Sequence, residues 1–257
     1  PTRLLAISVA CCGLACPPMD AAPAHLTRVI DQVKIQTGSA ASRPAKVGEA
    51  LPEGATLRTG ATGRAELAFE TGTVVRLGAR TDVALSGEAP TLQLQDGVVL
   101  FQSARRARAP KLATAGINLA TAGSTGMIER SGAAYVKILV LEGTTRVYLK
   151  RIGESVLVTA GQLLITAPDA KTLPEAVDFD VEQLYRTSVL TRRDFGPLAS
   201  ASAIQEAIRK QKNDPSLVHT NLVIFGRGTL VNLVEPTPAP AASSSPAPSR
   251  IPKPRKP

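Results

Sequence analysis

Histidine and cysteine are the first residues to examine, because they carry much of the nucleophilic and zinc chemistry of proteins. The chain of 257 residues contains only two histidines, His25 and His219, near its opposite ends. A catalytic triad or a zinc site needs at least one histidine with partners, or a carboxylate cluster in its place. We interpret His219 as a surface or pairing residue of a strand, and a hydrolase is the least favoured of the functions considered.

All three cysteines, Cys11, Cys12 and Cys16, fall near the start of the chain. A basic residue, a short apolar run and then small residues follow one another there, which is typical of a secretory signal peptide. The run is shorter than the roughly 20 apolar residues that span a bilayer. We predict a signal peptide over residues 1–24 with cleavage after Ala24, which would leave no thiol. Alternatively, Cys16 is acylated as a lipid anchor, and both forms stay open.

Acidic residues alternate at Asp178, Asp180 and Glu182, a spacing that could supply oxygen ligands for calcium. The segment lacks the glycine and the distal glutamate of an EF-hand loop, so a solvated helix face is expected instead. Segments 123–126 and 226–228 contain glycines but lack the lysine and hydroxyl residue of a phosphate loop, and we interpret them as turns. The sequence therefore predicts no enzyme, no catalytic residue, no metal ion and no cofactor.

Positive charge is the feature that points to a partner. The formal net charge is +9, and the excess is concentrated in two clusters. They consist of Arg105, Arg106, Arg108 and Lys111, and of Arg250, Lys253, Arg255 and Lys256. Nucleic acid is not expected, because the leader directs the chain to export and aromatic residues for base stacking make up only 3%. The sequence favours a solvated loop and a solubilising tail, and the alternative is that these eight residues contact an anionic envelope polymer.

Short strands are expected to position these residues, because apolar and polar side chains alternate along much of the chain. The first strand is expected at residues 29–34. Gly72, Gly97 and Gly143 lie between apolar runs and are predicted to occupy turns or bulges that need positive φ. The side chains expected in the core are Leu67, Phe69, Leu77, Leu85, Leu100, Ile138, Val140 and Val147.

The last third of the chain has a different pattern. Residues 177–184 have helical spacing, and a second helix is expected to begin in a capping box at Ser202 and Gln205. Residues 217–225 and 229–234 are expected to form a closing strand pair. From residue 235 to residue 257 the chain is rich in Pro, Ala and Ser, which predicts a disordered basic tail.

Motifs between residues 47 and 165 resemble the FecR domain family. They are GATLRTG (54–60), AELAF (65–69), TGTVVRL (71–77), LQDGV (94–98), LATAGSTG (119–126), VLEG (140–143) and TAGQ (159–162). The resemblance implies a mainly β, extracytoplasmic domain, either a β-solenoid or a twisted β-sandwich. We place this FecR-like domain at residues 29–170. The helical segment and the closing strand pair follow at residues 171–234.

The resemblance also implies a role in a family best known for relaying envelope signals to sigma factors. Neither a cytoplasmic anti-sigma segment nor a transmembrane helix is recognisable here, so we expect the extracytoplasmic module used alone, in the periplasm or outside the cell. Two functions stay open. One is an exported, non-catalytic binding or scaffold module of the bacterial cell envelope, whose partner is an envelope protein or an anionic surface polymer. The other is an accessory sensor linked to sigma-factor regulation.

Overall fold

The computed structural model describes residues 24–87, 91–104, 110–121, 123–215, 217, 223–226 and 229–232. Several predictions from the sequence lie outside this part of the chain. They concern the leader with Cys11, Cys12 and Cys16, the cluster Arg105, Arg106 and Arg108, His219, and the tail with Arg250, Lys253, Arg255 and Lys256. Within the described residues, no helix is long and apolar enough to cross a membrane.

Most strands belong to two sheets that share one long strand, β9 (Thr91–Gln102). Sheet A has the order β4 (Ala50–Leu51), β1 (Ala24–Ile30), β6 (Arg64–Phe69), β7 (Val74–Leu77), β9, β12 (Thr125–Ser131), β13 (Tyr135–Glu142), β16 (Gln162–Thr166) and β17 (Val177–Asp178). Sheet B has the order β3 (Arg43–Pro44), β2 (Val33–Thr37), β5 (Ala55–Thr59), β8 (Asp82–Ser86), β9, β10 (Lys111–Thr114), β11 (Ile117–Ala120), β14 (Thr144–Leu149) and β15 (Ser155–Thr159). All these pairs are antiparallel except β9 with β10.

The two sheets enclose one apolar core. Alternate residues of each strand point inward, as Leu67 and Phe69 do in β6 and Leu57 does in β5, and they belong to one buried cluster. All eight predicted core side chains are buried, which confirms that prediction. Along the chain, single strands or hairpins are added alternately to one sheet and to the other. The fold is therefore mainly β, as predicted, and it is a twisted sandwich whose chain winds between the two layers.

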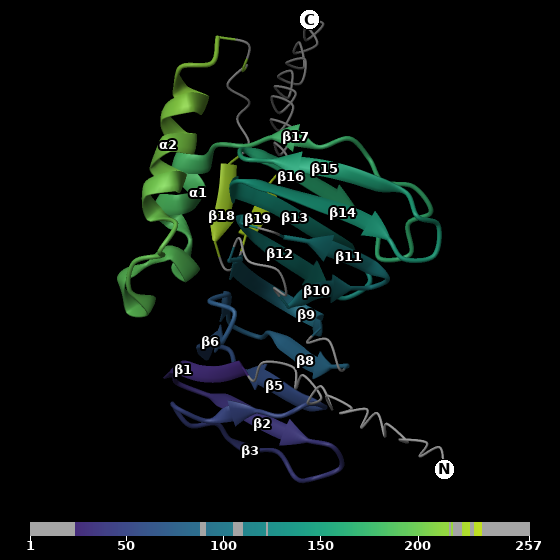
Figure 1. The fold of residues 1–257 in the computed structure, drawn as a ribbon, viewed down its shortest axis with the longest axis vertical. Coiled ribbons are helices and arrows are strands. Elements are labelled where there is room, and N and C mark those ends of the chain that lie inside the picture. The colour runs from purple at the N-terminus through teal and green to yellow at the C-terminus, as the bar shows by residue number, and fades with distance from the viewer. Residues whose placement is uncertain are drawn as a thin grey trace, which may run out of the picture.

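The outer face of sheet A is covered by the C-terminal segment. This segment contains α1 (Val181–Thr187), the short 3-10 helices η1 (Val189–Thr191) and η2 (Arg193–Phe195), and α2 (Ala201–Lys212). Leu184 and Ile204 from the helices share a second buried cluster with Leu100 and Leu139 of sheet A. Figure 1 shows these green helices along one side of the teal strands. The predicted closing pair is present as β18 (Val223–Gly226) and β19 (Thr229–Asn232).

The expected first strand at residues 29–34 is wrong, because the chain changes sheets within that segment. Asp31 has a φ of 53° in the turn between β1 and β2. Strand β1 pairs with β6 in sheet A, whereas β2 pairs with β5 in sheet B. Apolar and polar residues alternate on both sides of Asp31 almost without interruption, so the sequence pattern does not indicate the turn.

The expected helix starts also need correction. Val177 lies in β17 opposite Leu163, and α1 begins only after Asp180, whose side chain accepts a hydrogen bond from the Gln183 amide at 2.9 Å. The second helix begins at Ala201, so Ser202 is inside it rather than at its cap. The cap residue Ser200 makes no side-chain capping bond and instead contacts Thr125 of sheet A at 2.8 Å.

The three predicted turn glycines have φ values of 83° (Gly72), 93° (Gly97) and 76° (Gly143). Only Gly72 lies in a hairpin between paired strands, β6 and β7. At Gly97 the strand β9 bends from sheet B into sheet A, and at Gly143 the chain passes from β13 of sheet A to β14 of sheet B. All three glycines thus have the predicted positive φ, and at Gly97 and Gly143 the chain crosses between the layers instead of forming a hairpin within one sheet.

Candidate functional site

One buried arginine joins the C-terminal segment to the FecR-like sandwich. Arg76 of β7 is 2% exposed and pairs with Glu66 directly across the strand, at 2.8 Å. It also donates three hydrogen bonds to backbone carbonyl oxygens of the C-terminal segment, at Leu190 (2.9 Å), Phe195 (3.1 Å) and Gly196 (3.0 Å). The guanidinium also lies 5.0 Å from the centre of the Phe195 ring, a cation–π contact.

Burial is the main influence on this arginine. It lowers the pKa of Arg76, and the hydrogen bond and charge of Glu66 oppose that shift. Burying a guanidinium is costly unless its donors are hydrogen-bonded, and here Glu66 and three carbonyl oxygens accept hydrogen bonds from four of its five N–H groups. The outer face of sheet A is thus closed by an apolar cluster and by a charged clamp.

A second buried charge lies on the same face. Lys137 of β13 is 2% exposed, and its Nζ is 2.5 Å from Oε2 of Glu129, its cross-strand partner in β12. Burial lowers the pKa of Lys137, whereas the Glu129 charge acts in the opposite direction. The Tyr135 hydroxyl donates to Oε1 of Glu129 at 2.8 Å, and burial together with this carboxylate raises the pKa of Tyr135 to about 12. These charges are structural partners within sheet A.

The outer face of sheet B, by contrast, carries polar side chains that are partly or fully exposed to solvent. A row of register partners crosses eight neighbouring strands, and its members alternate with inward-facing core residues. This central row consists of Gln36, Thr56, Ala84, Gln93, Ala113, Asn118, Tyr148 and Ser155. Its side chains are small or carry hydroxyl and amide groups, which can both donate and accept hydrogen bonds. Such groups suit a hydroxyl-rich or peptide-like ligand laid across the strands.

Cations surround the central row. Lys34, Lys111 and Arg146 are exposed on outward positions of β2, β10 and β14. Arg58 pairs with Asp82 at 2.7 Å. Within the described strands of sheet B, the only acidic residues are Asp82 and Asp96, which lie opposite each other where β9 bends. The face therefore carries excess positive charge, which attracts anionic partners.

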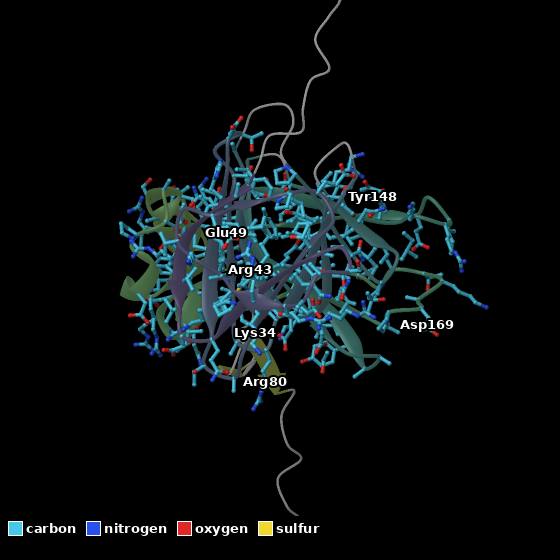
Figure 2. The ribbon with its side chains drawn as sticks, turned by 90° about the horizontal axis from the view of Figure 1, so that it is seen from below. Lys34, Arg43, Glu49, Arg80, Tyr148 and Asp169 are labelled. Carbon is cyan, nitrogen blue, oxygen red and sulfur yellow. The ribbon has the colours of Figure 1, made fainter. Side chains whose placement is uncertain are left out.

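The shape of this face restricts the ligands that can follow it. Neighbouring strands in a sheet rotate by roughly 20–25° each, so the row turns steadily along the sheet. Figure 2 looks along the molecule and shows Lys34 of β2 near the lower middle and Tyr148 of β14 toward the upper right. A linear, flexible polymer can follow such a band, whereas a rigid flat ligand contacts only a few strands of it.

Few of the residues that the sequence predicts at binding sites lie on the sheet B face. Lys111 lies on the sheet B face beside Thr91. The other seven basic residues of the two clusters predicted from the sequence are outside the described residues. Gly72, Gly97 and Gly143 shape the backbone and contribute no side chain. Sequence reasoning missed Lys34 and Arg146, although both occupy the polar positions of alternating strands and could have been found there.

The alternating acids do not form a common face in the structure. Asp178 belongs to β17, Asp180 caps α1, and Glu182 forms an ion pair with Lys212 at 2.7 Å. The hydrogen bond and charge of Lys212 lower the pKa of Glu182. No group of three or more His, Cys, Asp or Glu side chains suited to a metal ion occurs in the described part of the chain.

The fold and this face define a β-sandwich with one sheet closed by helices and the other open to solvent. The family model described as FecR protein matches residues 55–146, which confirms the resemblance found in the sequence. No curated protein matches the chain.

Two crystal structures of a proposed anti-sigma factor from Parabacteroides distasonis ATCC 8503, at 1.65 and 2.50 Å resolution, resemble it, each with 12% sequence identity and a TM-score of 0.43. The alignments cover 51% and 50% of this chain and 64% and 62% of those chains. The chain thus spans less than two thirds of their length.

Proposed function

We propose that this protein is an exported, non-catalytic binding module of the bacterial cell envelope, and that the outer face of sheet B is its binding surface. Its partner is an anionic polymer of that compartment, held by the central row and by the cations around it. The observation that carries the proposal is the contrast between the sheets. The C-terminal segment covers the outer face of sheet A. Sheet B presents hydroxyl, amide and basic groups, and its two acidic residues lie together where β9 bends.

Three features support an extracytoplasmic polymer as the partner. The leader-like first residues favour export, and domains of the FecR family are typically extracytoplasmic. Lys34, Lys111 and Arg146 supply charge along the band rather than at one point. The basic tail with Arg250 and Lys253 would add a second, independent contact if it extends from the sandwich. A lipid anchor at Cys16 remains the alternative to cleavage of the leader.

The direct test is cosedimentation with polygalacturonate, a carboxylate polysaccharide, at low salt, using uncharged dextran as the control polymer. The triple variant Lys34→Glu, Lys111→Glu and Arg146→Glu should bind at least about tenfold more weakly, a loss of about 1.4 kcal/mol. A matched variant with the same change in net charge, Arg209→Glu, Lys210→Glu and Lys212→Glu on α2, should bind nearly as well as the unchanged protein. Equal losses in the two variants would mean that net charge alone governs binding.

The second candidate is an accessory sensor that passes an envelope signal toward a sigma factor. The FecR family match favours it. Deleting the gene should then change transcription of a defined set of genes under envelope stress. An unchanged transcriptome would leave the binding module as the remaining proposal.

A further inference from the structure

A cleft of about 600 Å³ lies at one end of sheet A, away from the central row of sheet B. Its walls come from β6, the turn between β7 and β8, the bend of β9, the end of β12 and η1 of the C-terminal segment. Binding sites for small molecules commonly have volumes of about 300–1,000 Å³ and combine apolar walls with a few polar groups. Ala79, Val98 and Val189 supply apolar walls here, and Thr62 and Ser131 supply hydroxyl groups.

Three arginines from separate segments line this cleft: Arg64, Arg80 and Arg130. Arg80 makes no side-chain hydrogen bond or ion pair with any described residue. Arg130 donates from Nε to the Gly132 carbonyl oxygen at 3.2 Å, which leaves both terminal nitrogens of its guanidinium available. Arg64 is the only one of the three that is held by an acid, because its Nη1 lies 3.0 Å from Asp194.

The backbone at Gly97 lies between the segments that carry two of these arginines, Arg80 and Arg130. Arg130 of β12 is the register partner of Gly97 in β9. On the other side, a Cβ at Gly97 would come within 2.6 Å of the Arg80 carbonyl oxygen and of Thr81, so the turn that carries Arg80 packs directly against this glycine. The sequence therefore places two like charges beside one cleft, an arrangement that costs free energy unless an anion binds between them.

The backbone at Arg80 adds a second, independent observation. Arg80 has a φ of 50°, in the left-handed region that non-glycine residues rarely adopt. Such strain costs on the order of 1–3 kcal/mol and is often retained where a side chain must be aimed. Arg80 is exposed and lies at the rim of the molecule, so packing does not account for an arginine there (Figure 2).

We propose that this cleft binds a small molecule carrying a carboxylate or phosphate group, with Arg80 and Arg130 holding the oxyanion. Guanidinium groups suit both anions, because their paired donors match the two oxygens. Asp96 and Glu129 also line the cleft. Asp96 accepts from the Gly132 amide at 2.8 Å and Glu129 pairs with Lys137, so each carboxylate already has a donor. The cleft shares Asp96 with the margin of sheet B, but no residue of the central row and none of Lys34, Lys111 and Arg146 lines it.

The ion pair of Arg64 with Asp194 gives the site a link to the C-terminal segment. Asp194 belongs to η2, and its side chain is 53% exposed. A bound oxyanion competes with this carboxylate for Arg64. Removing the competitor in Asp194→Asn should therefore increase affinity, whereas a purely structural ion pair would give no such gain.

The test is isothermal titration calorimetry on the full chain at low salt with two probes, galacturonate for the carboxylate and inorganic phosphate for the phosphate. Arg130→Gln should weaken binding of the preferred probe about tenfold, and Asp194→Asn should strengthen it. Arg80→Gly should lose binding while its denaturation midpoint stays the same or rises, since glycine relieves the left-handed backbone. The control Arg146→Gln, on the polymer face, should bind like the unchanged protein.

The outcomes distinguish this site from the polymer face. Saturable binding of one probe, lost in Arg80→Gly and retained in Arg146→Gln, would support the cleft and identify the anion. Absence of saturable binding with both probes, or equal affinity in Arg80→Gly and the unchanged protein, would overturn it. Polygalacturonate binding by Arg80→Gly reports on the polymer face alone, so either proposal can fail without the other.

Discussion

At Arg76, one guanidinium connects parts of the chain that are more than 100 residues apart. It accepts no hydrogen bonds and donates to Glu66 and to three carbonyl oxygens of residues 190–196. Removing one partner of a buried ion pair is costly, because the other charge is left without compensation. The clamp is therefore expected to control whether the C-terminal segment stays on sheet A.

Replacing this arginine should separate the segment from the sheet. Arg76→Met is expected to lower the free energy of unfolding by about 3–5 kcal/mol, measured by urea denaturation, because the largely covered Glu66 carboxylate, which keeps only the hydrogen bond from Thr27, loses its ion-pair partner. Hydrogen exchange at residues 190–196 should increase. Arg58→Met, which breaks the exposed pair with Asp82, should cost no more than about 1 kcal/mol. Similar losses in both variants would contradict the clamp.

Tyr135 offers a test by pH. Its pKa is raised to about 12 in the fold, so its contribution to stability is present below its unfolded pKa near 10 and is lost as the pH rises through the folded value. At pH 9, Tyr135→Phe should be less stable than the unchanged protein, because the hydrogen bond to Glu129 is gone. The difference between their urea midpoints should narrow between pH 10 and pH 12. A difference that stays constant over this range would show that Tyr135 is not coupled to Glu129.

At the scale of the elements, the glycines at sheet crossings are under the tightest steric limits. A Cβ at Gly97 would meet backbone atoms at 2.6 Å, whereas Gly153 also has a positive φ, of 76°, but has nothing within 4 Å. Gly153→Ala should therefore lower the free energy of unfolding only by the cost of holding alanine in the left-handed conformation, about 1–2 kcal/mol. Gly97→Ala should cost clearly more in urea denaturation, because the turn at Arg80 must also move. Equal costs would mean that β9 can bend without this close contact.

The alternation of apolar and polar residues predicted most strands and the whole set of named core residues, since one face of each strand is buried. It could not show which sheet a strand joins, because a strand of either layer has the same period. Residues Glu66, Arg76 and Lys137 occupy outward positions and resemble solvent-exposed charges in the sequence. Arg76 and Lys137 are nevertheless buried, and Glu66 is largely covered, because a segment much later in the chain packs on sheet A; local patterns contain no information about that contact.

At the scale of the whole molecule, the chain forms three layers, which are the helices, sheet A and sheet B. Figure 1 shows the helices on one side only, so the two sheets have different surroundings. The basic residues of sheet B come from β2, β10 and β14, which are far apart in the sequence. No single cluster in the sequence predicts this band, and the fold is needed to bring its members onto one face.

Added salt should weaken polymer binding much more than it lowers the thermal stability of the sandwich. Exposed charges are screened beyond about 8 Å at physiological ionic strength. Polymer binding through Lys34, Lys111 and Arg146 should therefore weaken steeply as sodium chloride is raised from low to physiological levels in the cosedimentation assay. The thermal midpoint of the sandwich should change much less, because its core is apolar. Binding that does not respond to salt would exclude an electrostatic contact.

Sheet B, and not the helical side, is expected to face the partner. Site-specific photocrosslinking in intact cells tests it most directly, with the photoreactive residue placed at Gln93 or Asn118 in the central row and, as the control, at the exposed Lys210 of α2. Adducts should form from Gln93 and Asn118, should be identified by mass spectrometry as one common partner, and should be absent or much weaker from Lys210. Adducts that form mainly from Lys210 would contradict the account and place the binding surface on the C-terminal segment.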